Sequence, residues 1–357
     1  MRFLVTGGLG FIGSAVVRQL LQNDALTVLN IDKETYASDR RALAEYEAMD
    51  KYLFEKRDIR DREGVARIVS EFKPDVIMHL AAESHVDRSI DGPRNFVESN
   101  IVGTFELLEV TRGYWANLEE SAQQRFRFHH ISTDEVFGAL SMASEPFDED
   151  SPYSPNSPYS ASKAASDHLV RAWHNTYGIP TLLTNCSNNF GPFQNPEKLI
   201  PLMILNALQG LPLPIYGSGK QIRDWLYVED HATALIEVAL KGRPGETYNI
   251  GAKNEITNLE LVEWICNVLE ESGCSKPRNV IKFSDLITFV EDRPGHDQRY
   301  AIDARKIRNE LGWHPSEPFE KRLKDTVAWY VSNREFYKTQ KSTEENLYQR
   351  IGLGQRK

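Results

Sequence analysis

The feature that most constrains this chain is a cluster of glycines directly after its first apolar run. Residues 3–6 read Phe-Leu-Val-Thr, and Gly7, Gly10 and Gly13 follow at intervals of three, with a further glycine at position 8. The spacing matches both G-x-G-x-x-G and G-x-x-G-x-x-G, and an amphipathic pattern begins at residue 11. Glycines so placed between a strand and a helix allow a tight turn and a close approach of the backbone to a ligand. The pattern predicts a βαβ unit that binds a dinucleotide diphosphate at the N-terminus of its first helix.

Two carboxylates that follow the next predicted strands indicate which dinucleotide this is. Asp32 lies nineteen residues after Gly13, at the end of the second apolar run. A carboxylate there accepts hydrogen bonds from the ribose hydroxyls of adenosine and repels a 2′-phosphate, which favours NAD over NADP. Asp58 follows the next predicted strand, where it would either meet the adenine amino group or cap a helix.

The first half of the chain alternates short apolar runs with longer amphipathic ones. Strands are expected at 3–6, 26–31, 76–81, 127–132 and 181–185, and helices near 11–22, 61–72, 94–116 and 158–177. Strands that are apolar nearly throughout are covered on both faces. The alternation therefore predicts an α/β fold with a Rossmann-like, doubly wound parallel sheet.

A chain of 357 residues is long enough for a second unit. After residue 187 prolines become frequent and the alternation is lost. We assign residues 1–187 to the NAD-binding domain, with segments near 225–250 returning to it. Residues 188–333 would mostly form a smaller mixed α/β substrate-binding lobe, and 334–357 a C-terminal tail.

Composition excludes several other classes of protein. Acidic residues outnumber basic ones by 51 to 42, for a net charge of -9, whereas a nucleic-acid-binding protein normally has a basic face. Three cysteines without a CxxC pair predict neither a disulfide framework nor a metal site. We identify no signal peptide, and the apolar stretches are too short or too interrupted to span a membrane. We expect a cytoplasmic protein whose partner is a small molecule, without nucleic acid or membrane.

Two groups of residues predict acid–base chemistry. Tyr159 and Lys163 are four residues apart and share one helix face, where the ammonium would lower the pKa of the phenol. Thr133, Asp134 and Glu135 follow a predicted strand, and the carboxyl ends of such strands meet at the ligand crevice. Removing a proton from one carbon and protonating a leaving hydroxyl on the next requires two such carboxyl groups, whereas a simple alcohol dehydrogenase needs neither.

Six segments of this chain resemble the extended short-chain dehydrogenase/reductases. They are Gly7–Gly13, HLAAESHVDRS at 79–89, STDEV at 132–136, Tyr159-x-x-x-Lys163, NCSNN at 185–189 and RDWLYVED at 223–230. Within that superfamily the chain is similar to the dTDP-glucose 4,6-dehydratases from residue 1 to about 333. The Thr-Asp-Glu triplet discriminates them from sugar-nucleotide 4-epimerases of similar fold.

The resemblance implies a lyase that converts dTDP-glucose to dTDP-4-dehydro-6-deoxy-glucose and water, in dTDP-rhamnose biosynthesis. Tightly bound NAD would be regenerated in each turnover. Tyr159, with Thr133 and Lys163, would take the proton of the C4 hydroxyl. Glu135 would remove the C5 proton while Asp134 protonates the departing C6 hydroxyl. The helices near 94–116 and 158–177 would pair with those of a second copy in a homodimer.

The resemblance also implies which other residues bind ligands. The expected cofactor-binding residues are Gly7, Gly10, Phe11, Ile12, Gly13, Asp32, Lys33, Asp58, Ile59, Leu80, Ala81, Ala82, Ser84, Ser99, Tyr159, Lys163 and Asn189. The expected substrate-binding residues are Ser84, Thr133, Asn188, Lys198, Leu199, Pro214, Ile215, Tyr216, Arg223, Asn258, Asp292, Arg293 and His296.

Three other functions are compatible with parts of this pattern. A UDP-glucose 4,6-dehydratase would use the same chemistry, because thymine and uracil differ by one methyl group and a methyl group discriminates modestly. A sugar-nucleotide 4-epimerase would keep its activity without Asp134 and Glu135. A cofactor-sensing regulator would need the glycine loop but neither Tyr159 nor Lys163.

Overall fold

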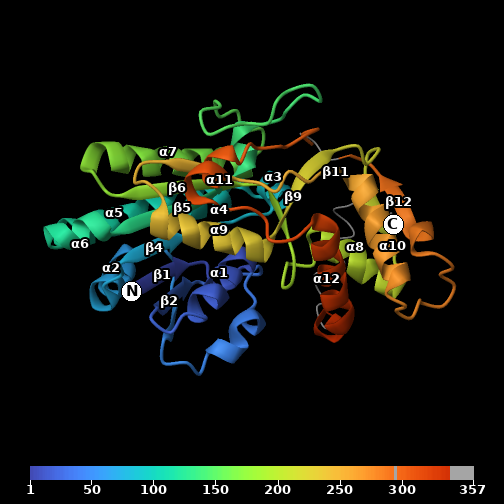
Figure 1. Cartoon of the computed structure of the whole chain (residues 1–357), viewed down its shortest axis with the longest axis horizontal. Coiled ribbons are helices and arrows are strands. Elements are labelled where there is room, and N and C mark those ends of the chain that lie inside the picture. Colours follow the sequence, from blue (N-terminus) through green and yellow to red (C-terminus); the bar gives the residue numbers. More distant parts are fainter. Residues whose placement is uncertain (293–295, 338–357) are drawn as a thin grey trace.

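The structure of the protein, a computed structural model, describes residues 1–292 and 296–337 (Figure 1). Within these residues seven parallel strands form the main sheet, in the order β10-β6-β5-β4-β1-β2-β3. The strands are β1 (Arg2–Thr6), β2 (Thr27–Asp32), β3 (Tyr52–Lys56), β4 (Val76–His79), β5 (Arg127–Thr133), β6 (Thr181–Cys186) and β10 (Thr247–Ile250). Because the strand order runs outward from β1 in both directions, the sheet is doubly wound, and the predicted fold class is confirmed.

Helices cover both faces of this sheet (Figure 1). On one face α1 (Phe11–Leu21) packs against α9 (Val228–Lys241). On the other face α5 (Gly103–Ala116) packs between α2 (Arg62–Phe72) and α7 (Pro158–Tyr177). In β1, Phe3 and Val5 belong to the first core and Leu4 to the second, so successive residues of one strand face opposite helix layers. Burial on both sides explains why the strands are apolar nearly throughout.

Three shorter helices connect β4 to β5. They are α3 (Val86–Asp91), α4 (Pro93–Phe96) and α6 (Glu120–Arg125). A π-helical turn, Val97–Val102, joins α4 to α5, so the helix predicted near 94–116 is one continuous but locally irregular run.

A second, smaller group of elements lies at one end of the molecule (Figure 1). In the described part of the chain it has two small sheets, ordered β11-β9-β7 and β12-β8. Its strands are β7 (Asn188–Phe190), β8 (Leu213–Tyr216), β9 (Ile222–Tyr227), β11 (Glu255–Thr257) and β12 (Ile287–Val290). The helices of the last part of the chain are α8 (Leu199–Gln209), α10 (Asn258–Glu271), α11 (Arg305–Leu311) and α12 (Phe319–Ser332).

The apolar core of this second group is separate from that of the main sheet. It joins the inner faces of α8, α10 and α12. The chain returns to the main sheet between β9 and β11, because α9 packs on α1 and β10 pairs with β6. The limits of the predicted domains stay a prediction. Among the described residues, no helix has both the length and the apolar character needed to cross a membrane.

Candidate active site

The glycine loop forms one end of a pocket at the carboxyl ends of the main-sheet strands. Gly7 has a φ of +74°, and a Cβ there would lie 2.7 Å from the backbone of Ala81, just after β4. A Cβ on Gly13 would lie 2.1 Å from the carbonyl oxygen of Gly7. The turn is therefore pressed against both α1 and the neighbouring strand. This leaves the N-terminus of α1 open to a diphosphate, as the sequence predicts.

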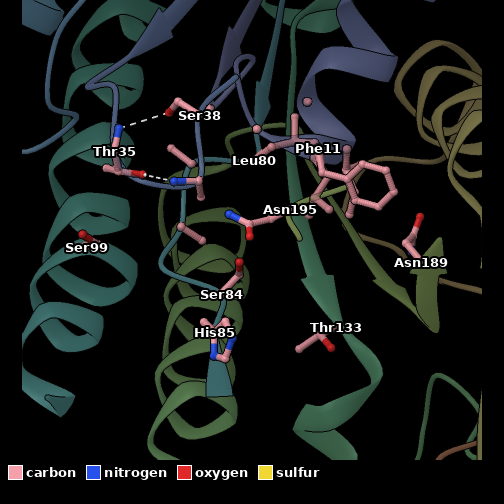
Figure 2. Close-up of a pocket in the computed structure, with 18 of the residues that line it drawn as sticks. Phe11, Thr35, Ser38, Leu80, Ser84, His85, Ser99, Thr133, Asn189 and Asn195 are labelled. Atoms are coloured by element: carbon pink, nitrogen blue, oxygen red, sulfur yellow. Dashed lines mark hydrogen bonds between the residues drawn. The ribbon is translucent and has the colours of Figure 1, made fainter. Parts of the chain in front are cut away.

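Asp32 organises the loop that follows β2. Its Oδ2 accepts a hydrogen bond from the backbone N–H of Leu9 at 3.0 Å. Its Oδ1 accepts bonds from the N–H of Glu34 at 2.8 Å and from the hydroxyl of Ser38 at 3.0 Å. Ser38 Oγ also accepts from the N–H of Thr35, so one carboxylate ties the glycine turn to the loop that borders the pocket (Figure 2).

The pocket continues past β4 to the residues predicted to perform the chemistry. Figure 2 shows Ser84 and His85 after β4, Thr133 at the end of β5 and Asn189 on β7 around the same space. Lys33, after β2, donates a hydrogen bond to the hydroxyl of Ser99 at 3.0 Å. Both residues were predicted to bind the cofactor, and this bond joins the loop after β2 to the π-helical turn.

Helix α7 brings Tyr159 and Lys163 into the pocket. A capping box holds its first turn, since the Ser157 hydroxyl accepts from the N–H of Ser160 at 3.0 Å and the Ser160 hydroxyl accepts from the N–H of Ser157 at 3.0 Å. This cap lies two residues before Tyr159, so the start of the helix fixes where the phenol enters the site.

The Tyr159 hydroxyl lies near Thr133, which acts to lower the pKa of the phenol. Burial and the nearby charge of Glu135 raise the pKa of Tyr159 well above its ordinary value. Lys163 donates to the carbonyl oxygen of Ile131 at 2.8 Å, toward β5. The lowering of the phenol pKa expected from Lys163 is not seen in the protein alone, where burial and the charge of Glu135 raise that pKa.

Asp134 and Glu135 open a short 3₁₀ turn, Asp134–Phe137, directly after β5. Asp134 is only 2% exposed, and its Oδ2 has no hydrogen-bond partner among the described residues. Burial and the charges of Glu135 and Asp224 raise the pKa of Asp134 well above its ordinary value. A raised pKa favours the protonated carboxylic acid, which is the form that can donate a proton.

The pocket gathers most of the predicted site residues. All the predicted catalytic residues and all the predicted cofactor-binding residues line it. Of the predicted substrate-binding residues, those that line it are Ser84, Thr133, Asn188 and Lys198.

The remaining predicted substrate-binding residues lie outside this pocket, in the second group of elements. They are Leu199 and Asn258, at the starts of α8 and α10; Pro214, Ile215 and Tyr216 on β8; Arg223 on β9; and Asp292 and His296. Arg293 lies outside the described residues.

Two contacts organise part of that second set. The Nδ1 of His296 lies 2.6 Å from Oδ1 of Asp292, and the His296 ring makes an edge contact with Tyr216. The Arg223 guanidinium lies 4.3 Å from the ring centre of Tyr300, and its charge acts on Asp134. Arg223 thus lies between this set and the carboxyl pair.

The predictions omitted several residues that line the pocket. They include Thr35, Tyr36, Ala37, Ser38, His85, Cys186, Gln194 and Asn195. The loop 35–38 directly follows Asp32, and that position was an available signal. No motif spacing marks the segment at 194–195. The alternative role of Asp58 as a helix cap is wrong, because the cap of α2 is Asp61, which accepts from the N–H of Gly64 at 3.0 Å.

Three of these residues carry ionisable side chains whose pKa is shifted, and that of Tyr36 is raised by burial and by the charge of Glu83. Burial, with the charge of Lys198, lowers the pKa of His85 to about 4. Burial also raises the pKa of the Cys186 thiol. At neutral pH His85 is a neutral imidazole and Cys186 a thiol, so neither adds a charge to the site.

The chain matches known proteins along nearly its whole length. Residues 4–326 match the family described as GDP-mannose 4,6 dehydratase. The dTDP-glucose 4,6-dehydratase of Neisseria meningitidis serogroup B is 56% identical over 353 residues, which covers 99% of both chains. The crystal structure of DesIV, a dTDP-glucose 4,6-dehydratase from Streptomyces venezuelae with NAD and TYD (dTDP) bound, has a TM-score of 0.85 and 43% identity, covering 95% of this chain and 99% of that one. A UDP-glucose 4-epimerase from Thermotoga maritima is also similar in structure, with a TM-score of 0.81 and 27% identity over 94% of this chain and all of its own.

Proposed function

This chain belongs to the GDP-mannose 4,6 dehydratase family, and from that membership we propose that it converts dTDP-glucose to dTDP-4-dehydro-6-deoxy-glucose and water. Its 56% identity to a dTDP-glucose 4,6-dehydratase, against 27% to the 4-epimerase, supports this substrate and reaction. The observation that carries the proposal is the buried carboxyl group of Asp134, with its raised pKa, beside Glu135 in the same pocket as Tyr159. A 4-epimerase removes no hydroxyl group and needs no such acid.

NAD is the cofactor that this site fits. The glycine turn leaves the N-terminus of α1 open to a diphosphate, and Asp32 offers a carboxylate where adenosine ribose hydroxyls would lie. NAD, when bound, supplies the means to oxidise C4 of the sugar and to reduce C6 later in the same turnover. NAD would thus end each turnover in the oxidation state in which it began, so it would not need to be exchanged between turnovers.

The first proton transfer belongs to Tyr159. It would accept the proton of the C4 hydroxyl, with Thr133 near the same phenol. Because burial raises the pKa of Tyr159, forming its phenolate requires positive charge nearby. Lys163, one turn further along α7, supplies that charge.

The loss of water belongs to the carboxyl pair. A 4-keto group acidifies the proton on C5, and Glu135 would remove that proton. The raised pKa of Asp134 favours its protonated form, so Asp134 would protonate the departing C6 hydroxyl. Return of a proton to C5 completes the turnover.

The nucleotide end of the substrate would lie toward the second group of elements. Lys198 lines the pocket, and Arg223 offers a planar cation suited to a diphosphate. Asn258, Asp292, Arg293 and His296 would assist there, and Pro214, Ile215 and Tyr216 would lie against the thymine. Ser84, Asn188 and Leu199 would contact the sugar or phosphate.

One experiment tests both substrate and reaction. The purified protein, with no added cofactor, is incubated separately with dTDP-glucose and UDP-glucose, and the sugar nucleotides are weighed by mass spectrometry. We expect dTDP-glucose to lose one water without net reduction of cofactor. Faster loss of water from UDP-glucose would identify UDP-glucose as the preferred substrate. If neither sugar nucleotide loses water after NAD is supplied, the proposed dehydratase activity is wrong.

The carboxyl pair distinguishes a dehydratase from an epimerase. We expect Asp134→Asn and Glu135→Gln each to lower the rate of water loss by about 100-fold or more, while oxidation at C4 continues. The measurement is absorbance of the reduced cofactor during a single turnover. An epimerase would keep its full turnover in both variants.

We also propose a homodimer formed by α5 and α7. Val97 and Val102, in the turn that leads into α5, are 47% and 40% exposed, and Tyr177 at the end of α7 is 43% exposed. Four such helices pack readily around a twofold axis, and light scattering would show twice the chain mass.

Location in the cytoplasm and a place in dTDP-rhamnose biosynthesis stay predictions from the family.

A further inference from the structure

A third ionisable residue lies on the same face of α7 as the catalytic pair. Tyr159, Lys163 and Asp167 follow one another at intervals of four residues. Asp167 is completely buried, and it does not line the pocket. A carboxylate is rarely buried so deeply without a specific partner. The mechanism above assigns it no role.

The surroundings of Asp167 keep it ionised. Its Oδ2 accepts hydrogen bonds from the hydroxyls of Ser132 at 2.8 Å and Tyr153 at 3.0 Å. Although burial raises the pKa of Asp167, the nearby His130 ring, the hydrogen bond from Ser132 and the charge of Lys163 hold that pKa below its ordinary value. Asp167 is therefore a fixed negative charge behind the active site.

His130, on β5, lies between this carboxylate and the catalytic lysine. Its Nε2 is 3.1 Å from Oδ1 of Asp167 and 3.4 Å from Nζ of Lys163. The Ser166 hydroxyl lies 3.2 Å from the same nitrogen. Burial and the charge of Lys163 lower the pKa of His130 to about 4, so the ring between the two charges is neutral.

We propose that Asp167 is a positioning residue for the reaction, whose carboxylate lies across His130 Nε2 from Lys163, supplies the counter-charge of the Lys163 ammonium through its electrostatic field, and keeps that side chain directed toward β5. This inference rests on the proposed function and assigns a group behind the site that its mechanism leaves out. A buried ammonium needs an opposite charge, because burial without one strongly disfavours the ionised form. The phenol of Tyr159 depends in turn on that ammonium.

The other charged and titratable groups near this pair come from several elements. Burial lowers the pKa of Lys163, and Asp167 and Cys186 act against that lowering. His79, on β4, lies with its ring centre 5.2 Å from that of His130 and is held neutral by burial. Arg171 donates to the hydroxyl of Tyr153 at 2.9 Å, on the side of Asp167 away from Lys163. Among these groups, Asp167 is the carboxylate that stabilises the Lys163 ammonium.

Tyr153 belongs to the acidic, proline-rich loop at residues 138–157, between β5 and α7, and it connects this loop to Asp167. The loop places the Tyr153 hydroxyl on Asp167, and the Tyr153 ring packs edge-on against Phe137. It thereby separates the carboxylate from solvent. An Asp167 carboxylate in contact with water would be a weaker counter-charge, since solvent screens a charge far more than protein does.

The first test is the pH dependence of kcat in Asp167→Asn, made in the full chain. Without the counter-charge Lys163 loses its proton at a lower pH, so the basic limb of the profile should move down by about one pH unit. Asp167→Glu restores the charge and should return the limb toward its original position. The control is Asp230→Asn. It removes a buried carboxylate on α9 that accepts a hydrogen bond from the Ser316 hydroxyl, and it should leave the basic limb in place.

A merely structural role would give a different result. Asp167→Asn would then lower kcat equally at all pH values and leave the limb unmoved, and that outcome overturns the inference. Wild-type protein that removes no water from dTDP-glucose would overturn the proposed function instead. The two failures are therefore distinguishable.

A second test needs no catalysis and covers the case in which Asp167→Asn fails to fold. Thermal unfolding is measured for Asp167→Asn, Lys163→Met and the double variant. If the two charges are partners, removing both should lower Tm less than the sum of the single losses, and should recover soluble protein if the single variant is insoluble. Additive losses, or a double variant as insoluble as Asp167→Asn, would contradict the pairing.

Discussion

Asp134 shows how one residue can serve the reaction at the expense of stability. Its carboxyl group is buried beside Glu135, and its pKa is raised well above the ordinary value. In the unfolded chain the same group ionises near pH 4. Above that pH the unfolded state is favoured by ionisation while the folded state still holds the proton. Asp134 therefore destabilises the fold increasingly as pH rises from about 4 toward its folded pKa.

This predicts an unusual stability profile for Asp134→Asn. The amide cannot ionise, so at pH 7 the variant should melt at least about 2 °C higher than wild type. At pH 4 the difference should shrink to within about 1 °C, because the folded wild type then holds the proton and about half of the unfolded wild type does so too. Melting is followed by circular dichroism at both pH values. Asp150→Asn, in the exposed loop, is the control and should change Tm at neither. A lower Tm for Asp134→Asn at pH 7 would mean that Asp134 is ionised in the folded protein.

At the scale of elements, the strand–turn–helix at the N-terminus depends on contact between backbones. A Cβ on Gly13 would lie 2.1 Å from the Gly7 carbonyl oxygen, and backbone atoms on both sides leave it no room. On Gly113, in the last turn of α5, a Cβ would meet no atom of the described residues within 4 Å apart from its own helix and chain neighbours.

The two alanine variants should therefore behave oppositely. Gly13→Ala should displace the turn from α1, and the purified protein should contain much less NAD, measured after acid release. Gly113→Ala should retain NAD and gain about 0.5–1 kcal/mol of stability, because alanine favours the helix. Equal NAD contents in the two variants would contradict a cofactor site built on the glycine turn.

Elements were predictable where their pattern is long and local. The amphipathic runs near 11–22, 61–72 and 158–177 correspond to α1, α2 and α7, with ends that differ by at most one residue. β7 and β11 have three residues each, too few to show a period. Such strands form only when a partner strand, here β9, is already in place.

For the whole molecule, buried neutral histidines make stability sensitive to acid. Burial lowers the pKa of His129 and of His231 to about 3, and that of His130 to about 4. In the unfolded chain each imidazole binds a proton below about pH 6.5. The folded state does not, so each contributes stability that is present above pH 6.5 and is lost as pH falls toward its folded pKa.

We expect the free energy of unfolding to fall steeply between pH 6.5 and 4.5, by about 1.4 kcal/mol for each such histidine per pH unit. Urea unfolding across this range measures the slope. His129→Asn should reduce the slope, whereas His168→Asn, whose side chain is not among the buried ones, should leave it unchanged. A flat profile would mean that these rings are protonated in the folded protein.

The sequence by itself determined the parts of this protein whose geometry is local. The glycine turn, the Tyr159–Lys163 pair and the Thr133–Glu135 triplet are each set by a few neighbouring residues and by one strand end or one helix turn. Together they were sufficient for the fold class, the cofactor and the class of reaction. They all meet in one pocket, because parallel strands end at the same edge of the sheet.

The tertiary structure decided what depends on residues distant in the chain. It brought the segment at 194–195 to the pocket, buried Asp134 so that its pKa is raised, and placed His130 between Lys163 and Asp167. Burial and charge pairing depend on which elements pack together, and these act over distances in space that the order of residues does not record. For this reason the Tyr159–Lys163 motif could be identified from the sequence, whereas the role of the Asp167 carboxylate could be inferred only from the folded structure.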